Sequence, residues 1–427
     1  MPFIRIVASI ACLFVLSTAK ASMREGALAL AMPSIKKIEG LAQSTPGCIS
    51  LAQGALRLQG VDQHIKDFAR EILLTDKADY YQDPLGLPAL RQRLAELLSQ
   101  RYATHLSSQQ IFIGHGGIGI LTSLALTFLK DGDEVLLAEP TYPVYVNLAR
   151  IAGASPVFTP AYELTPTKED HHHSWTFNFD KLEAAITEKT RMIILSNPSN
   201  PLGICLTKPD LEKLVRLCES RKIYLLLDEV YSDFIYEGEF QSAVPYAATS
   251  KFIVQIGSFS KNFAMSGFRV GYGVAHPDII NSVAAIQASI IANPTVVSQY
   301  AALFALDHYE YVEQYAQILK NNRDLFSAFF TELAKHNLVL YGRPSAGFYF
   351  FFKVPNREAN EFVMEVLQEA KVAMAPGTDF GPSATQCVRL CFARDPEIVA
   401  QSIQRLKNYF VAHHPGLFTA NVQQSAL

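Results

Sequence analysis

A single lysine, Lys261, stands between serine residues in the segment GSFSKNFAMSGFRVGYG, which covers residues 257–273, and Arg269 follows it by eight positions. A lysine amine becomes nucleophilic toward an aldehyde when burial or a nearby cation lowers its pKa. An arginine can also bind a phosphate through paired N–H donors. Lysine, hydroxyls and arginine together suggest a site for a phosphorylated aldehyde, pyridoxal phosphate, although a lone loop lysine would more often extend into solvent.

Other segments contain groups that suit the same ligand. The segment LLLDEVYSD places Asp228 at the end of an apolar run, with Tyr231 three residues later. A buried carboxylate can keep the pyridine nitrogen of such a cofactor protonated. The segment GHGGIGILTSL has the form of a glycine-rich turn that opens a helix, whose free amides suit a phosphate. Tyr142, in EPTYPVY, could stack on the ring. Each signal is weak by itself, since glycine turns and packed tyrosines are common.

Strand and helix patterns alternate along the chain from about Lys66 onward. This alternation predicts an α/β fold with a mostly parallel sheet and helices on both faces. Gly116, Asn200, Asp228 and Lys261 all fall where an apolar run gives way to a loop. Ligands of such sheets bind beyond the carboxyl ends of the strands, so we expect these residues to meet at one edge. After Tyr300, a long helical region and then further strands and helices predict a second, smaller α/β unit.

Composition excludes several function classes. The chain has 427 residues, 49% of them hydrophobic and 18% charged, with a net charge of −3. These values favour two well-packed domains and give no indication of nucleic-acid binding. The six cysteines form no CxxC pair, so we expect free, mostly buried thiols in a reducing compartment.

The segment SFSKNFAMSGFRVGY closely resembles the pyridoxal-phosphate lysine signature of the class I/II aminotransferases, the aspartate aminotransferase superfamily of fold type I. YQDPLGLPALR, NPSNPLG, LLLDEVYSDF and CVRLCFA resemble further motifs of that family in the same order, between about residues 33 and 410. The resemblance implies a three-layer large domain with a mostly parallel sheet over residues 61–300. It also implies a smaller α/β domain, built from the N-terminal segment 23–60 and the C-terminal part 301–427.

The resemblance also implies roles for individual residues. Lys261 resembles the lysine that forms the Schiff base and then moves the α-proton, and Asp228 matches the partner of the ring nitrogen. Arg389 matches the arginine that binds the substrate α-carboxylate. The other matches are Tyr231 and Asn200 at the phenolic oxygen, with Asn200 also near the substrate; Gly117, Ile118, Ser258 and Arg269 at the phosphate; Tyr142 on the ring; and Gly54 in the segment over the substrate.

The implied activity is transfer of an amino group from an L-amino acid to a 2-oxo acid by a ping-pong mechanism. The same residues also suit a C–S β-lyase or a related elimination or cyclisation enzyme. A non-catalytic cofactor-sensing domain fits less well, because no basic helix-turn-helix pattern precedes the fold. Tyr81 resembles a tyrosine that reaches the phosphate of the neighbouring subunit, which implies a homodimer.

Three further features leave alternatives open. Residues 1–22 have the outline of a signal peptide cleaved after Ala21, whereas the cofactor and 2-oxo acids favour a cytoplasmic enzyme. Arg57 could meet a distal substrate carboxylate, although such an arginine is more often solvated or paired within the protein. Leu56 stands where the family usually has proline. His171, His172 and His173 are consecutive, which indicates a solvated loop rather than a metal site.

Overall fold

The computed structural model describes residues 30, 32–168, 171, 173–415, 417 and 418. The signal peptide predicted over residues 1–22, with its cleavage after Ala21, lies outside the described residues. Among the helices that are described, none has both the length and the apolar composition needed to cross a bilayer.

A seven-stranded sheet forms the centre of the larger unit, in the order β2-β10-β9-β8-β7-β3-β4. β10 runs antiparallel to both of its neighbours, and the other pairs are parallel. The predicted mostly parallel sheet is therefore confirmed. Its strands are β2 (Ile111–His115), β3 (Glu134–Ala138), β4 (Ser155–Thr159), β7 (Thr190–Ser196), β8 (Tyr224–Asp228), β9 (Ile253–Ser258) and β10 (Val270–Val274).

Both faces of this sheet are buried. Leu225 and Leu227 belong to one apolar core, whereas Leu226, between them on β8, belongs to a second core on the opposite face. Alternate strand residues point to opposite faces, so a continuous apolar run is what a sheet covered on both sides requires. The helices of this unit are α4 (Gln63–Leu73), α5 (Pro88–Arg101), α6 (Gly116–Phe128), α7 (Val144–Ile151), α8 (Phe179–Ala184), α9 (Lys208–Arg221), α10 (Val244–Ala247), α11 (Phe259–Asn262), α12 (Pro277–Ile291) and α13 (Val296–Ala305).

The carboxyl ends of four strands carry the predicted polar groups. Asp228 is the last residue of β8, and Lys261 lies in α11 directly after β9. Asn200 follows β7 by four residues, and Gly116 begins α6 immediately after β2. The parallel register brings these ends to one edge of the sheet, as expected.

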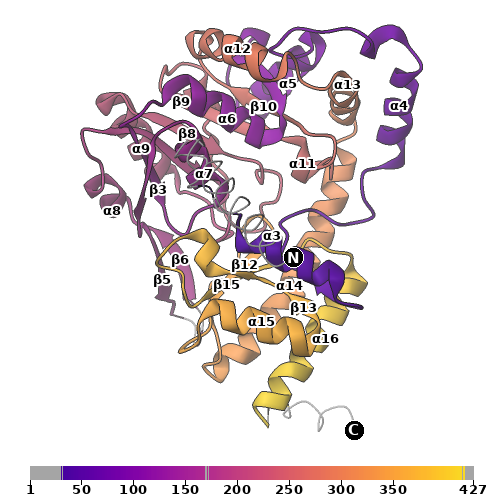
Figure 1. The fold of residues 1–427 in the computed structure, drawn as a ribbon, viewed down its shortest axis with the longest axis vertical. Coiled ribbons are helices and arrows are strands. Elements are labelled where there is room, and N and C mark those ends of the chain that lie inside the picture. Colours follow the sequence, from indigo (N-terminus) through magenta and orange to yellow (C-terminus); the bar gives the residue numbers. More distant parts are fainter. Residues whose placement is uncertain (1–29, 31, 169–170, 172, 416, 419–427) are drawn as a thin grey trace, which may run out of the picture.

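The second unit is built around a four-stranded sheet, β11-β12-β15-β14. The N-terminal helix α3 (Ser34–Ser44) packs on it, and β1 (Ile49–Ser50) pairs in parallel with β13 (Val372–Ala373). Figure 1 shows the indigo α3 beside the orange and yellow C-terminal elements. The other elements are α14 (Glu310–Lys335), β11 (Leu340–Tyr341), β12 (Tyr349–Lys353), α15 (Ala359–Ala370), β14 (Ala375–Pro376), β15 (Cys387–Cys391) and α16 (Pro396–His413); a separate hairpin joins β5 (Tyr162–Pro166) to β6 (His173–Phe177).

The long helical region expected after Tyr300 is divided into α13 and α14, with a break at residues 306–309. α13 packs on α4 and α5 in the larger unit, whereas α14 packs on α16 and β11 in the smaller one. Asp307, within the break, forms an ion pair with Arg93 of α5. Because α13 packs on helices of the larger unit and α14 on elements of the smaller one, we propose that the domain boundary lies in this break rather than at residue 300.

Candidate active site

A cavity of about 470 Å³ lies at the carboxyl edge of the large sheet, between the two units. Both units and the N-terminal segment contribute to its wall. Eleven of the twelve predicted site residues line it: Gly54, Gly117, Ile118, Tyr142, Asn200, Asp228, Tyr231, Ser258, Lys261, Arg269 and Arg389. Tyr81 does not line it, and its side chain is 88% exposed.

Lys261 presents its amine to this cavity. Nζ donates a hydrogen bond of 2.7 Å to the carbonyl oxygen of Gly54. Burial lowers the pKa of Lys261 to about 8, and the positive charges of Arg389 and Arg269 act in the same direction. The amine is therefore neutral, and nucleophilic, at a pH well below that of an ordinary lysine.

We expect capture of pyridoxal phosphate by the cofactor-free protein to accelerate with pH and to level off above pH 8. Below the Lys261 pKa of about 8 the amine is protonated, so the rate should fall about tenfold per pH unit. Stopped-flow absorbance between pH 6 and 10 measures this rate. An exposed model amine, Nα-acetyl-lysine, should show its inflection near about 10.4 under the same conditions. An inflection of the protein at that higher pH would contradict the prediction.

Asp228 is a buried carboxylate with one oxygen unpaired. Oδ2 accepts a hydrogen bond of 2.7 Å from the hydroxyl of Tyr145, while Oδ1 has no hydrogen-bond partner among the described residues. Burial raises the pKa of Asp228, and the Tyr145 hydroxyl opposes that effect. An unpaired buried acceptor is costly. A protonated pyridine nitrogen would supply the missing donor, so this end of the cavity fits the ring of pyridoxal phosphate.

Arg389 belongs to a polar network that spans the two units. Its Nη1 donates to Asn200 Oδ1 at 3.0 Å, and Asn200 Nδ2 lies 3.5 Å from the Tyr231 hydroxyl. The guanidinium carbon Cζ lies over the rings of Tyr349 and Phe380, at 4.4 and 4.7 Å from their centroids. Its Nε has no partner among the described residues. This buried, unpaired donor suits a carboxylate ligand.

The N-terminus of α6 has the geometry of an anion site. No side chain caps this helix, so the first-turn N–H groups, including those of Gly117 and Ile118, are not occupied by a cap. Arg269 donates to the carbonyl oxygens of Ser266 at 2.7 Å and His115 at 3.3 Å, which holds its guanidinium beside that terminus. Gly116 has φ +67°, and a Cβ there would overlap the Arg269 guanidinium. This end of the cavity fits the phosphate.

Two tyrosines of the site had no recognisable signal in the sequence. Tyr145 lies three residues after Tyr142, with nothing to distinguish it until the fold places it against Asp228. Tyr349 contacts the Tyr231 hydroxyl through its own at 2.8 Å. A Cβ on Gly54 would overlap the Tyr349 hydroxyl, which explains the need for glycine there.

Arg57 does not line the cavity. Its Nη2 forms an ion pair of 3.0 Å with Glu39 Oε1, whose side chain is 7% exposed. Of the two alternatives for this arginine, pairing within the protein is the one that the structure shows.

The described cysteines, Cys48, Cys205, Cys218, Cys387 and Cys391, are all free thiols. In the histidine run, His171 lies in a turn and His173 begins β6, while His172 lies outside the described residues.

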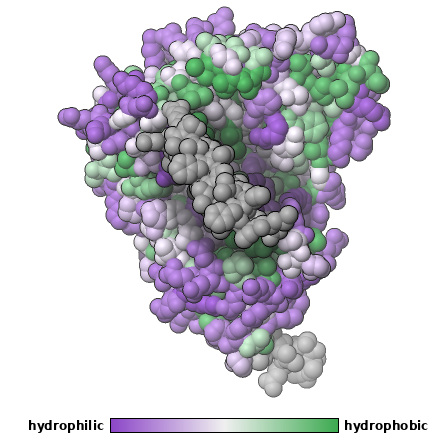
Figure 2. Space-filling view, in the orientation of Figure 1, coloured by the Kyte–Doolittle hydropathy of each residue, from purple (hydrophilic) through white to green (hydrophobic). Residues whose placement is uncertain are grey.

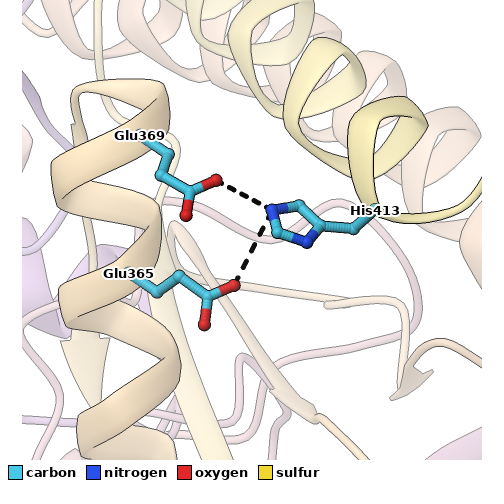
Figure 3. Close-up of side chains that lie close together, drawn as sticks. All are labelled: Glu365, Glu369 and His413. Carbon is cyan, nitrogen blue, oxygen red and sulfur yellow. Dashed lines mark hydrogen bonds and ion pairs between the residues drawn. The ribbon is translucent and has the colours of Figure 1, made fainter.

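Glu365, Glu369 and His413 form a cluster of possible metal ligands away from the cavity (Figure 3). His413 Nε2 contacts Glu369 Oε2 at 2.8 Å and Glu365 Oε1 at 3.9 Å. Glu365 also pairs with Arg357 and accepts a hydrogen bond of 2.5 Å from Tyr409. Because Glu365 already has these partners, the cluster is best understood as a tether between α15 and α16.

The fold and the groups that line the cavity suit an enzyme that uses an aldehyde cofactor. The family model "Aminotransferase class I and II" matches residues 46–406. The chain is 30% identical to an aspartate aminotransferase of Sulfolobus acidocaldarius, over 81% of this chain and 86% of that one. It is 31% identical to aromatic-amino-acid aminotransferase 2 of Thermococcus litoralis, over 87% and 94%. The structure of an aspartate aminotransferase from Thermotoga maritima superimposes with a TM-score of 0.80, at 27% identity, over 91% of this chain and 100% of that one.

The chain belongs to the class I and II aminotransferases, with the type I fold of pyridoxal-phosphate enzymes. It is a pyridoxal-phosphate-dependent aminotransferase, and amino acids and 2-oxo acids fit it as substrates. The comparisons do not favour the β-lyase alternative.

Proposed function

We propose that this chain transfers amino groups with Lys261 as the catalytic base, Asp228 as the partner of the ring nitrogen and Arg389 as the carboxylate anchor. The observation that carries the proposal is that these three groups line one cavity, and that Asp228 Oδ1 and Arg389 Nε have no hydrogen-bond partner in the part of the chain that the structure describes. Bound pyridoxal phosphate would supply an electron sink for the charge that develops when an amino acid loses its α-proton. The protein's part is to bind, orient and move that proton.

Each residue's part follows from its surroundings. Arg389 would hold the α-carboxylate, and its hydrogen bonds to Asn200 and the Ala52 carbonyl oxygen keep the guanidinium in place. Lys261, whose pKa of about 8 leaves a substantial part of the amine uncharged near neutral pH, would take the proton from the α-carbon and pass it to the cofactor. Tyr231 and Asn200 would donate to the ring's phenolic oxygen. Gly117, Ile118, Ser258 and Arg269 would hold the phosphate, with Tyr142 on the ring face.

The test is an absorbance titration of the loaded protein with a panel of L-amino acids. The panel includes aspartate, asparagine and aromatic amino acids, because those donors appear in the names of the relatives. Loss of the visible cofactor band, with release of the matching 2-oxo acid, supports amino-group transfer and identifies the donor. Release of pyruvate and ammonia with the band retained would indicate elimination and overturn the proposal.

We also propose that the protein is a homodimer in which each chain lends Tyr81 to the other's phosphate site. Leu73 and Leu74 form an exposed apolar patch at the end of α4, on the side of the molecule where Figure 2 shows hydrophobic surface. Tyr80, Tyr81 and, in α12, Ile290 are exposed as well. The N–H of Gln82 donates to Asn293 Oδ1 at 3.2 Å, which places the Tyr81 segment beside the end of α12. Such a patch favours burial against a second copy.

Mixing two defective variants should restore activity if this arrangement is right. Tyr81→Ala is expected to weaken cofactor binding roughly tenfold or more, by loss of a hydrogen bond to a charged group. Lys261→Ala should be inactive. A hybrid dimer has one site with both residues intact, so equal mixing should recover about a quarter of wild-type activity. Sedimentation should show a dimer throughout. Recovery of no activity, from variants that do exchange subunits, would contradict donation across the interface.

The cytoplasm is our proposed location, because the cofactor and 2-oxo acids are found there and the described cysteines are free thiols. N-terminal sequencing of the native protein tests this. A mature chain that begins at Ser22 would overturn it.

A further inference from the structure

Arg394 is a buried cation that binds only uncharged groups in the described part of the chain. Arg394 lies three residues after the end of β15 and is 4% exposed. Nε donates to the carbonyl oxygen of Ser50 at 2.9 Å, and Nη2 to that of Gln53 at 3.0 Å. Nη1 donates to Ala55 and Ala393 at 2.9 Å each. A buried charge is tolerated when its donors are satisfied, and only a guanidinium offers enough of them in a fixed plane.

Three of these carbonyls belong to one segment, residues 50–57, which we call the strap. Residues 53–55 of the strap line the cavity. The strap also contacts the two proposed catalytic cations. The carbonyl oxygen of Gly54 accepts from Lys261 at 2.7 Å, and that of Ala52 accepts from Arg389 Nη2 at 2.7 Å. Arg394 therefore binds the strap at residues 50, 53 and 55, which flank the Ala52 and Gly54 carbonyls that accept from Arg389 and Lys261.

We propose that Arg394 is a positioning residue. It holds the strap over the cavity, so that the carbonyl oxygens of Gly54 and Ala52 stay beside Lys261 and Arg389. The inference rests on the proposed roles of those two residues. When they engage the cofactor and the substrate, their hydrogen bonds to the strap compete with those ligands. Arg394 does not line the cavity, so its hydrogen bonds to the strap would not compete with the ligands. These bonds would persist and keep the strap closed over the substrate.

The position of Arg394 predicts a particular kinetic pattern. Arg394 does not line the cavity, so it takes no part in proton transfer. A loosened strap would weaken binding of the amino acid without changing Lys261 itself. We therefore expect Arg394→Met to raise KM for the amino acid about tenfold or more, and to change kcat by less than about threefold.

Hydrogen exchange gives a readout that does not depend on activity. Full-length protein, with and without pyridoxal phosphate, is compared as wild type, Arg394→Met and Arg394→Lys, using peptides that cover the strap and β8. We expect exchange in the strap to rise at least about tenfold in Arg394→Met, with β8 unchanged. Arg394→Lys keeps the charge but offers one nitrogen in place of three, so its exchange should also rise.

Arg405→Met is the matched control. Arg405 also donates to backbone carbonyls, those of Gly47 and Lys371, but from the exposed surface, so its loss should leave the strap and KM unchanged. Unchanged strap exchange in Arg394→Met would overturn the proposal. Faster exchange in both the strap and β8 would also overturn it, because it would show a general role in folding. Wild-type behaviour of Arg394→Lys would overturn it too. Hydrogen exchange tests the role of Arg394 alone, whereas the activity of Lys261→Ala tests the proposed function. Failure of one proposal can therefore be distinguished from failure of the other.

Discussion

Replacing Lys261 by alanine abolishes amino-group transfer, with an expected fall in turnover of at least about 10⁴-fold. Lys261 is the amine that lines the cavity with a pKa lowered to about 8, so its removal takes away both the attachment point and the base. Turnover is measured with the best donor from the panel. The visible band of the attached cofactor should also be lost from the variant in the absence of amino acid.

Lys251→Ala is the matched control for this change. Lys251 is an exposed lysine that pairs with Asp278 at 2.6 Å, outside the cavity, so its removal should leave turnover and the cofactor band as in the wild type. Substantial transfer by Lys261→Ala would show that another group acts as the base, and the proposed mechanism would fail.

Asp228→Asn should change function and stability in opposite directions. An amide cannot neutralise a protonated ring nitrogen, so we expect cofactor affinity to fall roughly 10- to 100-fold and turnover to fall with it. In the cofactor-free protein, the same change should raise Tm at pH 7. Burial raises the pKa of Asp228 above its usual value, so ionising the carboxylate destabilises the folded state.

The pH dependence of that stability gain follows from the sign of the shift. The destabilisation caused by Asp228 is absent below the pKa of this carboxyl in the unfolded chain, where it is protonated in both states. The destabilisation grows as pH rises toward the higher pKa of Asp228 in the folded protein. The Tm difference between Asp228→Asn and wild type should therefore shrink as pH falls toward about 4. Thermal melts of cofactor-free protein across this range measure it. A variant less stable than wild type at pH 7 would mean that the carboxylate stabilises the empty fold.

Glu229→Gln is the control for the exchange of acid for amide. Glu229 is the next residue in the chain but does not line the cavity, and it accepts hydrogen bonds of 2.6 Å from Ser242 Oγ and the Ala243 N–H. Burial raises its pKa to about 8, so it is mostly protonated at pH 7 and resembles an amide already. We expect cofactor affinity in this variant to match the wild type.

The succession of strands and helices along the chain, and the loops that follow the strands, could be predicted because those signals are local. A continuous apolar run such as that of β8 is buried on both faces, and its first acid, Asp228, marks where the strand ends. The break between α13 and α14 could not be predicted, because helical patterning continues on both sides of it. The two helices separate there because α13 packs on helices of the larger unit and α14 on elements of the smaller one, which is a property of the assembled fold.

The sequence by itself determined which chemical groups stand at the strand ends, and their spacing was enough to indicate the cofactor and the family. The tertiary structure decided which neighbours those groups meet. Tyr145 contacts Asp228 across 83 positions of the chain, and Arg394 reaches the Ser50 carbonyl across 344. Contacts at such separations depend on how the elements within each unit pack together, and no local pattern encodes them. The pairing of Arg57 with Glu39 was likewise decided by packing, since the sequence favoured a solvated or internally paired arginine but could not name its partner.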